Sequence, residues 1–188
     1  ADALNRYTTD CLRQLKDAKV DVGMVQLGNE TNGILCGETT WGNICQLMEA
    51  GSRAVRAIFP EALVAVHFTN PENADAMRFY AKTLDDFRLD YDVFATSYYP
   101  YWHGTLENLA AVLSQIAEAY DKKVMVAETS YAYTPEDTDF FGNTIGEGGS
   151  YAKPYPLTVQ GQADAVADVV RTMAEDTTNG IGVFYWEG

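Results

Sequence analysis

The chain has 188 residues, with 13 Lys and Arg against 27 Asp and Glu, so its formal net charge is −14 at pH 7. A surface this acidic repels nucleic-acid backbones and anionic lipid headgroups, and we expect neither nucleic acid nor a membrane as a partner. Hydrophobic residues make up 47% of the chain, which indicates a globular fold, and no stretch approaches the roughly 18 consecutive apolar residues of a membrane span.

The chain alternates short apolar runs with segments of helical spacing. Continuous apolar runs predict strands at residues 22–27, 63–68, 93–98, 124–127 and 180–186. Apolar residues three or four positions apart predict helices at residues 4–18, 41–59, 74–84, 106–120 and 159–173. Because the strand runs are continuous rather than alternating, we expect a parallel sheet covered by helices, which is an α/β fold.

The residues that leave successive strands, Glu30, Thr69, Tyr99 and Glu128, lie roughly 30 to 40 residues apart, about one strand–helix unit each. Such repetition fits either a doubly wound open sheet or a (β/α)8 barrel, and both place ligands at the carboxyl ends of the strands. A complete barrel needs about 250 residues. Five strands therefore predict either a small open sheet or the second half of a barrel.

Two acidic side chains stand at strand ends in apolar surroundings, Glu30 in VQLGNE and Glu128 in VMVAETSY. In a barrel arc these carboxylates would face each other across the mouth. One carboxylic acid and one carboxylate are what glycosidic hydrolysis requires. The alternative is that each glutamate caps a helix N-terminus or pairs with a basic residue.

Polar and aromatic neighbours favour the catalytic interpretation. Asn29 carries an amide that can hydrogen-bond a sugar hydroxyl, and the phenols of Tyr98 and Tyr99 stand near enough to orient a carboxylate. Trp186 ends the last strand, where an indole can stack on a sugar ring. His67 lies near the end of its strand, where it is either a buried core residue or a donor to substrate or carboxylate.

Five segments in order resemble glycoside hydrolase family 53, the endo-β-1,4-galactanases that cut the galactan side chains of pectin. They are LGNE (27–30), TSYYPYWHGTL (96–106), VMVAETSYAY (124–133), TVQGQA (158–163) and GVFYWEG (182–188). The resemblance covers essentially the whole chain. It implies a retaining glycosidase built on a (β/α)8 TIM barrel that acts on a polysaccharide, β-1,4-galactan or arabinogalactan.

The resemblance also implies roles for individual residues. Glu30 falls on the general acid/base of the family and Glu128 on its nucleophile. Asn29, Tyr98 and Trp186 fall on positions that contact the sugar or the nucleophile, and His67 is expected among them.

The same resemblance implies that residues 1–188 are the C-terminal portion of one barrel domain, from its third helix to its eighth strand. We then expect a partner, which is either the missing part of the barrel or another chain. A secreted or cell-surface enzyme is expected. The alternatives are a non-catalytic carbohydrate-binding half-barrel and another enzyme of the same clan, such as a mannanase.

A long loop over residues 131–156 is rich in glycine and proline and is expected to be a lid or a substrate-contacting wall. Within it Asp137, Asp139 and Asn143 present oxygen ligands at a spacing that hard cations accept. Some family members resembling this chain bind calcium in this loop, so a structural Ca²⁺ is expected here, the alternative being a solvated acidic loop. No cofactor is expected for the reaction itself.

Overall fold

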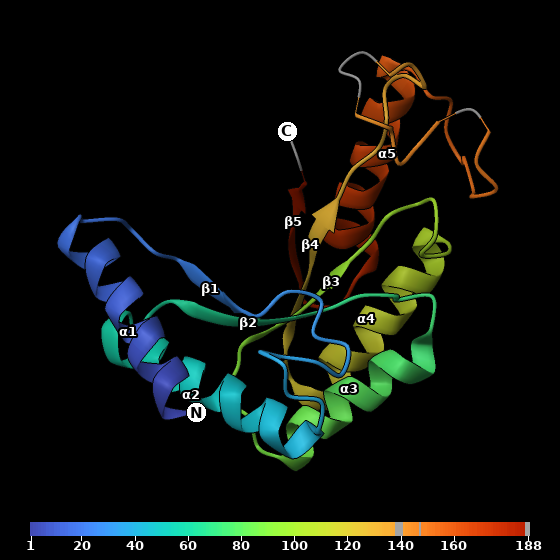
Figure 1. Ribbon diagram of the computed structural model, residues 1–188. Coiled ribbons are helices and arrows are strands. Elements are labelled where there is room, and N and C mark those ends of the chain that lie inside the picture. The colour runs from blue at the N-terminus through green and yellow to red at the C-terminus, as the bar shows by residue number, and fades with distance from the viewer. Residues whose placement is uncertain (138–140, 147, 187–188) are drawn as a thin grey trace.

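The computed structural model describes residues 1–137, 141–146 and 148–186 (Figure 1). All predicted strands and helices are confirmed in order, with ends shifted by a few residues. The strands are β1 (Met24–Leu27), β2 (Leu63–Phe68), β3 (Val93–Ser97), β4 (Lys123–Thr129) and β5 (Gly180–Tyr185). The helices are α1 (Asp2–Asp17), α2 (Trp41–Ile58), α3 (Ala74–Asp86), α4 (Leu106–Tyr120) and α5 (Val159–Arg171), with a π-helical turn η1 (Thr172–Asp176) after α5.

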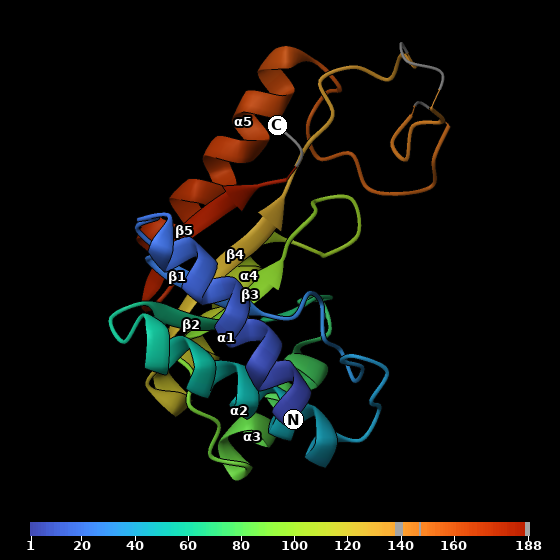
Figure 2. The ribbon, with the colours of Figure 1, turned by 60° about the vertical axis from the view of Figure 1, so that its left-hand side comes forward.

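The five strands form one parallel sheet in the order β1-β2-β3-β4-β5, so each strand pairs with the one before it in the chain. A doubly wound sheet reverses its strand order at a switch point, and this order contains no reversal. Figure 1 shows the sheet curving with the helices along its outside, and Figure 2 shows the strands fanned side by side. The fold is therefore an arc of a (β/α)8 barrel rather than an open sheet.

The main hydrophobic core lies between the sheet and the helices. Phe68 on β2 stacks on Tyr80 of α3 and on Phe94 of β3, with ring centroids 4.8 and 5.1 Å apart. Trp41, the first residue of α2, closes the cluster against the Phe68 and Tyr80 rings. Because successive strand residues point to opposite faces, every second residue of a strand joins this core.

The helices are anchored locally at their ends. Thr105 and Thr158 accept hydrogen bonds from the backbone N–H of the third residue of α4 and α5, which are N-caps. Helix α1 packs on α2, where Asn5 donates to the carbonyl oxygen of Ala50 at 2.7 Å. Among the helices that the structure describes, none has the length and apolar character required to cross a membrane.

The inner face of the sheet carries a smaller cluster of mostly compact side chains. They are Ala65, Val93, Ala95, Met125 and Ala127. Strand alternation then places His67, two residues after Ala65, and Ser97, two residues after Ala95, on the same inner face nearer the carboxyl ends. The inner face is thus apolar over most of its length and becomes polar only at the carboxyl ends of the strands, where the predicted site lies.

Candidate active site

Glu30 stands just beyond β1 on a sharply turning backbone. Gly28 and Glu30 both adopt positive φ, +82° and +45°. A Cβ at position 28 would lie 2.6 Å from the Thr31 Cγ2, so only glycine fits there. The turn is tied to β2 by Thr31, whose backbone N–H and hydroxyl both donate to the carbonyl oxygen of His67, at 2.8 and 2.9 Å. A left-handed non-glycine residue costs roughly 1 kcal/mol or more, and such strain is common where a side chain must be aimed.

Glu128 reaches the same face through a β-bulge. Thr96 pairs with Val126, but Ser97 pairs with Glu128, so the register of β3 and β4 shifts by one residue at Ala127. The bulge is fixed by the backbone N–H of Tyr98, which donates to the carbonyl oxygen of Glu128 at 2.8 Å. A regular strand carrying Ala127 on the inner face would turn Glu128 towards the helices. The bulge therefore aims the carboxylate at the mouth of the arc.

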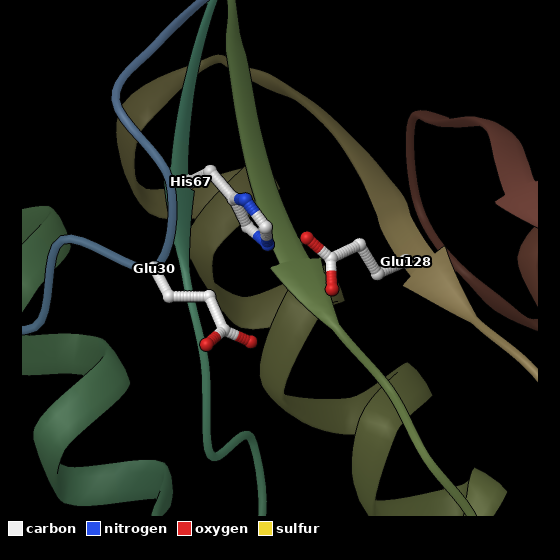
Figure 3. A group of neighbouring side chains, drawn as sticks. All are labelled: Glu30, His67 and Glu128. Atoms are coloured by element: carbon white, nitrogen blue, oxygen red, sulfur yellow. The ribbon is translucent and has the colours of Figure 1, made fainter. Parts of the chain in front are cut away.

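The two glutamates face each other with His67 between their strands (Figure 3). One carboxylate oxygen of Glu30, one of Glu128 and one ring nitrogen of His67 all lie within 4.8 Å of one another. Retaining glycosidases hold their two carboxyl groups about 5–5.5 Å apart, whereas inverting enzymes need about 6.5–9.5 Å to admit a water. The geometry is that of a retaining site.

Each carboxylate has a hydroxyl donor. The Ser97 hydroxyl donates to Oε1 of Glu30 at 2.6 Å, and the Tyr99 phenol donates to Oε2 of Glu128 at 3.0 Å. Burial raises the pKa of Glu128 above its usual 4.5, the Tyr99 hydrogen bond opposes that rise, and the negative charge of Glu30 adds to it. The phenol is thus the contact that favours ionised Glu128.

Tyr98 was predicted at the sugar or the nucleophile, but the phenol that bonds to the predicted nucleophile is that of Tyr99. Tyr98 lies in the core between sheet and helices, where its hydroxyl donates to the carbonyl oxygen of Gly104 at 3.0 Å. Ser97 and Tyr99 share one face of the chain and Tyr98 takes the other, because side chains alternate along an extended segment. Tyr99, which lies on the same face as Ser97, is therefore the tyrosine that reaches Glu128.

The structure places the other predicted residues around the two glutamates. His67 has no exposed surface and bonds to Ser97, so it lies inside the site rather than in the core between sheet and helices. Asn29 is exposed beside Glu30, in the position from which an amide could meet a ligand. Trp186 is half-exposed, and its backbone N–H donates to the carbonyl oxygen of Thr129 at 2.9 Å. Sugar contact by Asn29, His67 and Trp186 stays a prediction.

An aromatic wall beside Trp186 was not predicted residue by residue. Tyr101 stacks on Tyr131 with ring centroids 4.8 Å apart, and the hydroxyl of Tyr131 donates to the carbonyl oxygen of Tyr155 at 2.6 Å. The side chains of Tyr101, Tyr131, Tyr185 and Trp186 line a cavity of about 550 Å³ at the ends of β4 and β5. Tyr131, Tyr133 and Ile145 of the long loop line this cavity, and contact of the loop with substrate stays a prediction.

The predicted calcium ligands are described only in part. Asp139 lies outside the described residues. Asn143 is described, and its side-chain N–H donates to the carbonyl oxygen of Glu136 at 3.0 Å. In the described part of the chain, the acidic, His and Cys side chains close enough to share a metal are those of the two site glutamates and His67, and Asp137 is not among them. The calcium site stays a prediction.

The cluster of Glu30, His67 and Glu128 has the donor types of a metal site, but its histidine already has hydrogen-bond partners. His67 Nδ1 lies 3.1 Å from the amide nitrogen of Gln26, and its Nε2 lies 2.9 Å from the Ser97 hydroxyl. Both ring nitrogens are therefore engaged, and a metal would have to displace one of these partners. The donor set fits a proton-transfer site better than a metal site.

Paired carboxylates at the carboxyl ends of barrel strands are the arrangement that retaining glycoside hydrolases use. The family model for glycosyl hydrolase family 53 matches residues 1–188. The chain belongs to glycosyl hydrolase family 53.

Individual relatives agree with the family. An endo-beta-1,4-galactanase of Bacillus subtilis (strain 168) is 55% identical over 184 residues, which cover 98% of this chain and 43% of that protein. An arabinogalactan endo-beta-1,4-galactanase of Cellvibrio japonicus (strain Ueda107) is 33% identical over 200 residues, which cover 100% and 52%. The structure of the GH53 catalytic domain of Ignisphaera aggregans superposes with a TM-score of 0.86 at 31% identity, covering 98% and 52%. The chain thus spans about half the length of these relatives.

Proposed function

We propose that this chain is part of a complete barrel that acts as a retaining endo-β-1,4-galactanase, with Glu30 as general acid/base and Glu128 as nucleophile. The observation that carries the proposal is the carboxylate pair within 4.8 Å at the strand ends of a family 53 chain. The substrate class is taken from the relatives named endo-beta-1,4-galactanase.

The proposed reaction has two displacements. In the first, a carboxylate oxygen of Glu128 attacks the anomeric carbon while Glu30 donates its proton to the glycosidic oxygen, so the bond to the departing sugar breaks and a galactosyl ester of Glu128 forms. In the second, water attacks the same carbon, Glu30 takes the water's proton, and the ester bond breaks to regenerate the Glu128 carboxylate. One water is consumed per bond cut.

The surroundings of Glu128 suit a nucleophile that is kept reactive. Attack requires the ionised carboxylate, which burial disfavours and the Tyr99 phenol favours. Its partial burial limits the water that would otherwise solvate and weaken the nucleophile. Trp186 and Tyr185, which are 49% and 40% exposed, supply aromatic rings of the kind on which sugar rings stack.

The two roles can be told apart with azide, a small nucleophile that needs no general base. In the complete barrel, Glu128→Ala with azide and an aryl β-galactobioside should yield the α-galactosyl azide, because azide attacks in place of the missing carboxylate. Glu30→Ala should yield the β-galactosyl azide, because azide then intercepts the ester on Glu128. Exposed Glu61, at the amino end of β2, provides the control Glu61→Ala, which should behave as wild type. Interchanged products would reverse the assignment.

We further propose that catalysis requires the rest of the barrel, either in the same polypeptide or on another chain. The support is the share of the relatives' length that this chain covers and the open order of its sheet, in which β1 and β5 are edges. Gel filtration and a galactan assay of the 188-residue chain test this. A monomer that releases reducing ends at the rate of the complete barrel would refute it, and binding without cleavage would favour a carbohydrate-binding role.

We also propose that the complete enzyme works outside the cell on the galactan of pectin, and that the loop at residues 137–143 binds a structural calcium ion there. A polysaccharide too large to cross a membrane supports the location. Galactanase activity found in cell lysate and absent from the culture medium would contradict it. A melting temperature that is the same in calcium and in chelator would contradict the calcium site.

A further inference from the structure

A chain of three hydrogen bonds leads from the exposed Gln26 of β1 through two buried side chains to Glu30. It runs from Gln26 to His67, from His67 to Ser97 and from Ser97 to Glu30, with lengths of 3.1, 2.9 and 2.6 Å. These side chains lie on three neighbouring strands and on the turn that follows β1. His67 and Ser97 have no exposed surface, so water does not compete for the central bond between them.

The direction of the first bond follows from a second contact of Gln26. Its amide nitrogen donates to the carbonyl oxygen of Gly28 at 2.8 Å, and a carbonyl can only accept. The amide group is therefore oriented with its nitrogen towards both Gly28 and His67. Nδ1 of His67 must then accept the other N–H of Gln26.

The direction of the remaining bonds follows in turn. A neutral imidazole that accepts at Nδ1 carries its proton at Nε2, so His67 donates to the Ser97 hydroxyl oxygen. Burial lowers the pKa of His67, against the opposing pull of the Glu30 charge, in agreement with a neutral ring. The single proton of Ser97 is left to donate, and its partner is Oε1 of Glu30.

We propose that Gln26, His67 and Ser97 are positioning residues that hold Oε1 of Glu30 as a hydrogen-bond acceptor and so confine the transferable proton of Glu30 to Oε2. A carboxylic acid whose Oε1 already accepts a 2.6 Å bond from a hydroxyl carries its own proton on the other oxygen. Ser97 is also the residue paired with Glu128 across the bulge. The proposal rests on the role of Glu30 given above and specifies which oxygen acts.

The consequence is measurable because protonation matters only for poor leaving groups. Galactan departs as a sugar alkoxide and needs the proton, whereas dinitrophenolate departs without one. In the complete barrel, Ser97→Ala should lower kcat/KM on galactan roughly 10- to 100-fold but on a dinitrophenyl β-galactobioside less than about 3-fold. Ser97→Thr keeps the hydroxyl and should recover most of the galactan activity.

The control is Ser52→Ala. Ser52 is a buried serine whose hydroxyl donates to the carbonyl oxygen of Asp90 at 2.7 Å, far from the glutamates. Its loss should leave kcat/KM unchanged on both substrates. Equal losses of kcat/KM on both substrates for Ser97→Ala, or no loss on galactan, would overturn the proposed positioning role. If Ser97→Ala fails to fold, Gln26→Met should also lower kcat/KM more on galactan than on the dinitrophenyl substrate, though by a smaller factor. Equal losses on the two substrates, or no loss on galactan, would then overturn the proposal. Inactive wild type on both substrates would instead refute the proposed function.

Discussion

The two ends of the sheet treat acidic side chains in opposite ways. At the amino ends of the strands, Arg56 lies between Asp90 and Asp92, with 2.9 Å contacts to both, and also donates to the carbonyl oxygen of Ala62 at 3.1 Å. At the carboxyl ends, Glu30 and Glu128 face each other, and within the described part of the chain neither forms an ion pair.

The difference separates stability from function. The Arg56 guanidinium holds the pKa of Asp90 below its usual 3.8, so the charges at the amino end favour folding. At the carboxyl end the pKa of Glu128 is raised, so its charge is held at a cost. Barrels commonly divide their two ends in this way, with the catalytic groups at the carboxyl ends.

The largest expected effect is loss of activity without loss of stability. Glu128→Gln in the complete barrel should lower kcat on galactan by at least about 1,000-fold, because the nucleophile is removed. The melting temperature should stay the same or rise, because a buried charge next to Glu30 is gone. Calorimetry and reducing-end assays measure both; a stability loss comparable to that of a core substitution would show that Glu128 is structural.

Tyr99→Phe should move the pH profile. Protonated Glu128 cannot attack, so activity falls as pH drops through the pKa of Glu128, which lies above 4.5. Removing the phenol takes away a contact to the ionised form, so the acid limb of kcat/KM should shift to higher pH by roughly one unit. Tyr155→Phe is the control, since its hydroxyl bonds to Asp168 away from the site. A limb that does not move, or moves to lower pH, would contradict the role of Tyr99.

At the opposite end, Arg56→Met should lower stability and spare activity. It removes the partner of two carboxylates that are partly exposed, and we expect a loss of about 1–2 kcal/mol in the free energy of unfolding. Arg53→Met is the matched control, because Arg53 is more exposed and its ion pair in the described chain is with Glu49, one helical turn away at 3.5 Å. Denaturant unfolding gives the values. A fall in kcat/KM of the folded variant would break the division between the two ends.

The smallest expected effect is the pH dependence of that stability. Because the folded pKa of Asp90 is lowered, its contribution is present above the unfolded value, near 3.8, and is lost as pH falls through the folded value. Unfolding free energies measured from pH 5 to about pH 2 should therefore fall less steeply in Arg56→Met than in wild type. Parallel slopes would show that Arg56 does not act through Asp90.

The strands, the helices and the two glutamates were predictable because each leaves a local pattern. An apolar run followed by a polar residue marks a strand end, and both Glu30 and Glu128 stand at such ends. The choice between a barrel and an open sheet was not predictable, because both folds have the same strand–helix repeat along the chain. Strand order decides between them, and order depends on contacts between residues far apart in the chain.

The errors and omissions in the site concern contacts that the sequence does not reveal. For the phenol at the nucleophile, Tyr98 was chosen where Tyr99 is correct, because the sequence does not show which of two adjacent tyrosines shares the inner face with Ser97. The bulge at Ala127, which turns Glu128 to that face, likewise leaves no local signal in the sequence. Ser97 and Gln26 were missed because serine and glutamine at strand positions carry no pattern of their own, and their roles appear only through their neighbours.

The pairing of Glu30 and Glu128 as acid/base and nucleophile is tested most directly by the anomeric configuration of the first product. Proton NMR during cleavage of galactan oligosaccharides by the complete barrel records the new reducing end before it mutarotates. Two displacements through a Glu128 ester predict the β-anomer first, with the α-anomer growing later. The α-anomer as the first product would require a single displacement by water and would contradict the pairing.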